Sequence, residues 1–192
     1  LVLEPKTGKI RYSYPFRSRL RESAIAATPL LVNDTVFLSG TYKIGAIALQ
    51  LAPEGLNVLW KDPKAMQNHW ATSVYKDGYL YGMDGRHESG ANFRCVDFQT
   101  GEVIWATRAK IGRASFVMAE GHLIAVGERG HLVLIEVSPE QYIEKARVQL
   151  LNYPVWTPPI LAQGHLYIRN ERQLMCLDLR NKTDDSPRPE SN

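Results

Sequence analysis

Side chains with useful chemistry are concentrated in the segments that precede or join short hydrophobic stretches. His69 and Trp70 lie in QNHWATS, and Arg113 lies in KIGRAS. A histidine beside carboxylates can ligate a metal or transfer a proton, whereas aromatic and arginine side chains anchor binding partners. The candidate binding residues are His69, Trp70, Asp84, Arg86, His87, Glu88, Arg113, Tyr153, Trp156, Arg169 and Asn170.

The spacing of the histidines argues against a metal site or an acid–base pair. His69 and His87, with two carboxylates beside them, match no metal-binding motif, which favours a solvated polar loop. The sequence contains no Gly-x-Ser-x-Gly, phosphate loop or dinucleotide fingerprint. Cys95 and Cys176 are too few for a disulfide framework or a structural zinc site. We therefore predict no catalytic residue and no metal ligand.

Composition and charge exclude other classes of function. The 192 residues carry 23 basic and 20 acidic side chains without a run of five like charges, which disfavours nucleic-acid binding. No window approaches 18 apolar residues, so no membrane span is predicted, and the N-terminal LVLEPKTGKIRY has neither a cationic leader nor a small-residue cleavage site. Residues 181–192, NKTDDSPRPESN, lack apolar side chains and are predicted to form a disordered tail.

Short apolar segments predict an all-β fold. TVFLSG, GYLYGMD, GHLIAVG, HLVLIEV and GHLYIR are rich in β-branched and aromatic residues and are bounded by turn residues. No window of ten or more residues shows the 3.6-residue period of a helix. The 14 glycines and 11 prolines also favour a fold rich in turns.

These segments recur at a fixed interval. The turn residues Asp34, Gly78, Gly121 and Gly164 are separated by 44, 43 and 43 residues, and each copy continues into a second apolar strand. A period of about 40–45 residues with four short strands is typical of a β-propeller blade. A blade cannot bury both of its faces alone, so it needs neighbours.

The spacing of Asp97, Gly101 and Trp105 indicates a structural role and not a binding site. The aspartate can accept bonds from turn amides and the glycine can adopt a positive φ, which predicts a tight turn between the third and fourth strands. The tryptophan would then lie on the outer strand, across the gap to the next blade. The predicted structural residues of the repeats are Glu4, Gly8, Tyr12, Gly55, Trp60, Asp97, Gly101, Trp105 and Asp178.

Residues 95–105, CVDFQTGEVIW, resemble the pyrroloquinoline-quinone (PQQ)-type propeller repeat, whose signature is Ala-x-Asp-x-x-Thr-Gly-x-x-x-Trp. The resemblance covers about residues 1–180 and implies that Cys95 and Cys176 occupy a small inward position as buried thiols. The family contains quinoprotein dehydrogenases and cofactor-free envelope propellers of the assembly-factor type. The ending VWTPPILAQGHLYIRNERQLMCLDLR is similar to the last blade of bacterial envelope proteins, which implies a periplasmic, secreted or cell-envelope location.

The number of repeats predicts about half of a seven- or eight-bladed ring. Such an open arc would expose sheet faces and strand edges. We therefore expect it to pair with a second propeller half, to form a homodimer, or to close into an unusually small ring. The predicted units are a partial blade at 1–14, blades at about 24–61, 69–108 and 114–151, and a three-stranded last blade at 155–179.

Loops before the first strand and between the second and third strands should share one face. Trp70, Arg113 and Trp156 occupy equivalent positions there, beside the expected channel. The leading hypothesis is a non-catalytic scaffold that binds a protein or a small ligand through this face. The two tryptophans could instead plug the channel.

The alternative hypothesis is a PQQ-dependent alcohol dehydrogenase, or a relative of one without its cofactor. Resemblance to those enzymes implies a stacking tryptophan, cations for the cofactor carboxylates, a calcium site, an aspartate base and often adjacent cysteines. Trp70 or Trp156 could stack, and Arg113 could meet a carboxylate. However, the sequence has no adjacent cysteines and no compact set of oxygen ligands for calcium, so a cofactor-free chain is predicted.

Overall fold

The computed structural model describes residues 1–20, 23–87 and 90–180, and these contain β-strands but no α-helix. The predicted disordered tail, 181–192, lies outside the described residues. Nothing in the described ranges forms a helix with the length and apolar character needed to cross a membrane.

The strands form five antiparallel sheets, each built from strands consecutive in the chain. Sheet A contains β1 (Val2–Leu3) and β2 (Ile10–Tyr12). Sheet B contains β3 (Leu30–Val32), β4 (Thr35–Gly40), β5 (Gly45–Ala52) and β6 (Gly55–Asp62). Sheet C contains β7 (Val74–Lys76), β8 (Tyr79–Asp84), β9 (Asn92–Asp97) and β10 (Val103–Thr107). Sheet D contains β11 (Ala114–Ala119), β12 (His122–Gly127), β13 (His131–Glu136) and β14 (Ile143–Gln149). Sheet E contains β15 (Ile160–Ala162), β16 (His165–Arg169) and β17 (Leu174–Asp178).

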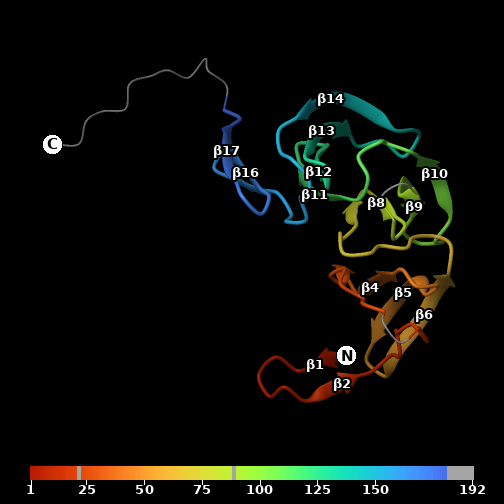
Figure 1. Ribbon diagram of the computed structural model, residues 1–192. Coiled ribbons are helices and arrows are strands. Elements are labelled where there is room, and N and C mark those ends of the chain that lie inside the picture. Colours follow the sequence, from red (N-terminus) through yellow and green to blue (C-terminus); the bar gives the residue numbers. More distant parts are fainter. Residues whose placement is uncertain (21–22, 88–89, 181–192) are drawn as a thin grey trace.

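The sheets follow one another around an open arc, with sheets A and E at its two ends (Figure 1). This arrangement confirms the predicted fold class, an all-β partial propeller of four-stranded antiparallel units. The turn between the first two strands of a sheet is tight for a local reason. In sheets C, D and E both of its central residues have positive φ, the geometry that suits a two-residue hairpin turn and that favours glycine second.

Apolar side chains from successive sheets fill the space between them. Phe37 of sheet B packs in one buried cluster with Leu80 of sheet C, and Phe93 of sheet C shares a second cluster with Leu123 of sheet D. A third cluster joins Ile124 of sheet D to sheet E. Each large side chain buried in this way contributes about 1.5–3 kcal/mol. The core is therefore divided among the gaps between sheets.

An aromatic side chain on the outer strand of sheets A, B and C donates a hydrogen bond to the next sheet. The Tyr12 hydroxyl donates to the carbonyl oxygen of Pro53 at 2.6 Å. The indole Nε1 of Trp60 donates to the carbonyl oxygen of Phe98 at 2.9 Å, and Trp105 donates to that of Ser138 at 3.2 Å. All three carbonyl groups belong to the turn between the third and fourth strands of the next sheet. The outer strand of sheet D, IEKARVQ, contains no aromatic residue.

The turn that receives Trp60 is built by Asp97 and Gly101. The Asp97 carboxylate accepts hydrogen bonds from the backbone amides of Gln99 at 2.9 Å and Thr100 at 2.8 Å. Gly101 has a φ of +79°, and a Cβ atom there would lie 2.6 Å from Cε3 of Trp60. The absence of a side chain thus lets the indole lie against the turn.

The turn of sheet A has the same backbone hydrogen bonds. The Gly8 amide donates to the Glu4 carbonyl at 2.8 Å, as the Gly101 amide donates to that of Asp97 at 2.9 Å. Gly8 has a φ of +69°. Gly55 has a φ of +157° at the start of β6. At the far end of the arc, the Asp178 carboxylate accepts a bond from the Arg180 amide at 3.0 Å.

The two cysteines differ in exposure. Cys95 is buried, as predicted, but the prediction for Cys176 is wrong, because its side chain is exposed. Cys176 lies on β17, the edge strand of sheet E, and no sheet among the described residues covers that face. Ile160 and Leu174 are 60% and 71% exposed on the same terminal sheet.

Substituting Gly101 measures the contact with Trp60. Gly121 is the matched control, because it has a φ of +73° but open space where a Cβ would lie. We expect Gly121→Ala to cost about 1–2 kcal/mol for the left-handed conformation alone. Gly101→Ala adds a clash with the indole, and overpacking of this kind costs about 1–3 kcal/mol more. Urea unfolding of both variants measures the difference, and equal costs would contradict the contact.

The exposure of the cysteines predicts their reactivity. Burial raises the pKa of Cys95 to about 11, so little of it is thiolate near pH 8. We expect one equivalent of a thiol reagent to react rapidly with the folded chain, at Cys176, and a second only after unfolding. The Cys176→Ser variant should lose the rapid phase, and a fast phase that survives in this variant would contradict the burial of Cys95.

Candidate functional site

A buried ion pair lies on the face formed by the loops before the first strand and between the second and third strands of each sheet, which we call the loop face. Arg113 immediately precedes β11 and Glu128 immediately follows β12. Glu128 is 0% exposed. Its carboxylate accepts hydrogen bonds from Nε of Arg113 at 3.0 and 3.1 Å and from the Arg113 backbone amide at 3.0 Å. A charge buried in this way is stable only when it is paired, so the two side chains hold each other in place.

The same guanidinium connects sheet D to sheet C. Nη1 of Arg113 donates to the carbonyl oxygen of Arg86 at 3.1 Å and lies 3.2 Å from Nδ1 of His69. His69 precedes β7, and Arg86 lies in the loop between β8 and β9. Arg113 therefore contacts both kinds of loop that form this face.

Tyr42 extends the contacts to sheet B. Its hydroxyl oxygen lies 3.3 Å from Nε2 of His69, and the Arg86 guanidinium lies 4.7 Å from the centre of its ring. We name Tyr42, His69, Arg86, Arg113 and Glu128 the arginine network. It joins loops from three consecutive sheets, and it includes Tyr42, which is not among the residues predicted from the sequence.

The charge state of His69 follows from this environment. Burial lowers the pKa of His69, and the Arg113 and Arg86 charges lower it further. The imidazole is therefore uncharged at neutral pH. Because Nδ1 faces a guanidinium donor, Nδ1 accepts and Nε2 carries the proton, which it donates to the Tyr42 hydroxyl.

Asp84 does not belong to the arginine network. Its carboxylate lies 2.9 Å from Nη2 of Arg94 and accepts the Gln67 amide at 2.8 Å. Burial raises the pKa of Asp84, although Arg94 opposes the shift. His87 is exposed, and Glu88 lies outside the described residues. Within the described ranges, no three His, Cys, Asp or Glu residues come close enough to hold a metal ion.

Further along the arc, Tyr153 and Trp156 form an exposed aromatic pair. They are 58% and 51% exposed, and their rings meet edge to face with centroids 6.4 Å apart. Trp70 is only partly exposed. Of the other candidates, Arg169 is exposed at the end of β16, and Asn170 donates to the Asn152 carbonyl at 3.1 Å.

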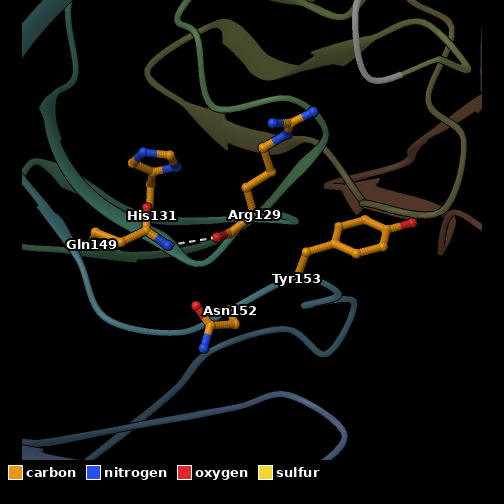
Figure 2. A pocket seen from close by; sticks show the side chains of 5 residues that line it. All are labelled: Arg129, His131, Gln149, Asn152 and Tyr153. Carbon is orange, nitrogen blue, oxygen red and sulfur yellow. Dashed lines mark hydrogen bonds between the residues drawn. The ribbon is translucent and has the colours of Figure 1, made fainter.

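A hollow of ≈ 560 Å³ lies beside Tyr153. Figure 2 shows it framed by Tyr153, Asn152, Gln149, Arg129 and His131, with Gln149 donating to the Arg129 carbonyl at 2.7 Å. A second hollow of ≈ 400 Å³ shares Asn152 and Tyr153 with the first. Its other walls are Pro154, Asn170, Glu171, Arg172 and Gln173.

Comparison with known proteins identifies the family. The family model described as "Outer membrane protein assembly factor BamB" matches residues 1–107. The chain belongs to this family. No curated protein matches the chain.

Solved structures of similar fold include BamB from Moraxella catarrhalis, with 10% sequence identity and a TM-score of 0.60. That match covers 79% of this chain and 42% of the Moraxella protein. The computationally designed Ika8 protein matches with 11% identity and a TM-score of 0.55, over 79% of this chain and 44% of Ika8. The designed Ika4 protein matches with 11% identity and a TM-score of 0.57, over 88% of this chain and 99% of Ika4. At these identities the likeness shows the fold alone.

The residues considered for a quinone do not fit that cofactor. Arg113 is committed to Glu128 and to the other contacts of the arginine network. Asp84 is committed to Arg94, so it offers no free carboxylate as a catalytic base. In this BamB-family chain, Arg113 and Asp84 thus do not supply the free cation and the free carboxylate that resemblance to the dehydrogenases implies.

The depressed histidine pKa predicts a pH dependence. Burial also lowers the pKa of His131, with further contributions from Arg147 and Arg129. Below the unfolded pKa of 6.5 the unfolded chain binds protons that these folded histidines do not, so stability falls as the pH decreases. NMR titration should give midpoints below 6.5 for both histidines, and His69→Gln should reduce the slope of stability against pH. Midpoints at or above 6.5 would rule out the buried, uncharged state.

Proposed function

We propose that this BamB-family chain is a non-catalytic scaffold in outer-membrane protein assembly, located in the cell envelope. It binds a protein partner through the loop face that carries Trp70, Arg113 and Trp156. The family description and the BamB-like fold support a scaffold or assembly role. The observation that carries the proposal is the arginine network, which fixes loops of three sheets in one arrangement.

Fixed loops reduce the entropy that a binding surface loses when a partner docks. Glu128 is fully buried, so the network is built into the fold, and Arg86 on its exposed side is available to a partner. The exposed Tyr153 and Trp156 belong to the residue types that dominate protein interfaces. The loop face therefore combines a rigid base with exposed anchors.

We also propose that a second propeller half closes the ring, either within the same polypeptide or as a separate chain or second copy. Among the described residues, sheet E has three strands where sheets B, C and D have four, and sheet A has two. The exposed apolar side chains of β15 and β17 support a covering sheet at that end. If a second half closes the ring, the native assembly should have a larger mass than this chain alone, or Cys176 should become protected from thiol reagents. An assembly with neither property would contradict ring closure.

Site-specific cross-linking tests the loop face. A photo-cross-linking residue replaces Arg86 or Trp156 in cells, and the control replaces Glu120, which is exposed in the turn between β11 and β12. We expect outer-membrane assembly proteins to be captured from the first two positions and not from Glu120.

Glu128→Gln supplies the matched test of the network, because it removes the buried charge with little change in shape. We expect it to weaken cross-linking from Arg86 while the secondary structure, followed by circular dichroism, is retained. Capture of the same proteins from Glu120, or of no assembly protein from either loop position, would overturn the proposal.

A further inference from the structure

The two hollows beside Tyr153 adjoin each other. They share Asn152 and Tyr153, and their volumes of ≈ 560 and ≈ 400 Å³ lie within the range of about 300–1,000 Å³ that small-molecule sites occupy. Tyr153 stands between them. A ligand that filled both would be elongated and would cross this residue.

The walls indicate a ligand rich in hydroxyl groups. Four of the lining side chains are amides, and an amide both donates and accepts hydrogen bonds, as a hydroxyl group does. Gln149 and Asn170 already donate to backbone carbonyl groups, so a ligand would meet chiefly the amide groups of Asn152 and Gln173. Pro154 is the only aliphatic side chain that lines either hollow among the described residues, so an apolar peptide anchor would find little matching wall. The amides are Gln149, Asn152, Asn170 and Gln173.

The charges do not require an anionic ligand. Arg129 and Arg172 stand with Glu171 along the two hollows, and the lowered pKa of His131 leaves its ring uncharged at neutral pH. A different hollow of the loop face has a contrasting character, because four cations and no carboxylate line it. Those cations are Arg17, Arg19, Lys43 and Lys61.

Tyr153 supplies a surface for the apolar side of the ligand. Its side chain is 58% exposed, and its ring is perpendicular to that of Trp156, so the two rings do not stack in parallel. The segment is fixed from behind, because the buried Val155 donates its amide to the Glu128 carbonyl at 2.9 Å. Asn170 holds the Asn152 carbonyl in the same way. The wall is therefore formed before any ligand arrives.

We propose that these hollows bind an oligosaccharide, with one sugar on each side of Tyr153. A sugar ring presents an apolar C–H face to an aromatic ring and hydroxyl groups to amides and guanidinium groups, which is the combination found here. The inference goes beyond the proposed function, because it assigns a ligand class to one sector of the loop face.

Titration with neutral trisaccharides tests the site on the full chain. The probes are maltotriose, cellotriose and N-acetylglucosamine trimer, and their binding is followed by tryptophan fluorescence and by saturation-transfer NMR. We expect at least one trisaccharide to bind saturably and its monosaccharide to bind at least tenfold more weakly. Tyr153→Ala and Asn152→Ala should each weaken binding tenfold or more.

Tyr167→Ala is the matched control, because Tyr167 is an exposed tyrosine on β16 that lines neither hollow. It should bind as the unmodified chain does. Absence of saturable binding, or equal losses in the Tyr153 and Tyr167 variants, would overturn the proposal. An extended peptide that bound these hollows in place of every sugar would also overturn it. Cross-linking from Arg86 is independent of these results, so the scaffold function can stand if the sugar site fails.

Discussion

The fold depends on an aromatic side chain that spans the gap between sheets. Tyr12, Trp60 and Trp105 are each partly buried and donate a hydrogen bond to a backbone carbonyl of the next sheet. The ring supplies apolar area and the hydrogen bond supplies direction, so neighbouring sheets pack in a defined orientation. A blade without such a contact would still bury its faces, but their angle would depend on side-chain packing alone.

This fixed angle is what brings the arginine network together. Arg113 and Glu128 belong to one sheet, but His69 and Tyr42 belong to two others, and their contacts exist only because the sheets hold their relative positions. The buried carboxylate in turn requires its guanidinium partner. The relative orientation of the sheets therefore determines both the apolar packing between them and the polar contacts of the loop face.

The repeat period and the turn residues were sufficient to predict the fold class and the family resemblance, because each of these patterns depends on residues that are close together in the sequence. The site was less accessible. Arg113 and His69 were selected by residue type, but Tyr42 was missed, since its contacts depend on the angle between sheets. Asp84 pairs with Arg94, a partner that the loop pattern could not indicate. Cys176 was expected in a core because its repeat position is inward, and only the sheet order reveals that this face is uncovered.

The outer strand of sheet D carries no aromatic side chain, and this has a mechanical consequence. The junction with sheet E relies on an apolar cluster and on the backbone bond between Val155 and Glu128. Apolar packing resists separation but tolerates sliding, whereas an indole anchored to a carbonyl resists both. The orientation of sheet E against sheet D is therefore set by the shapes of the apolar side chains between them and by the backbone of the segment that carries Tyr153.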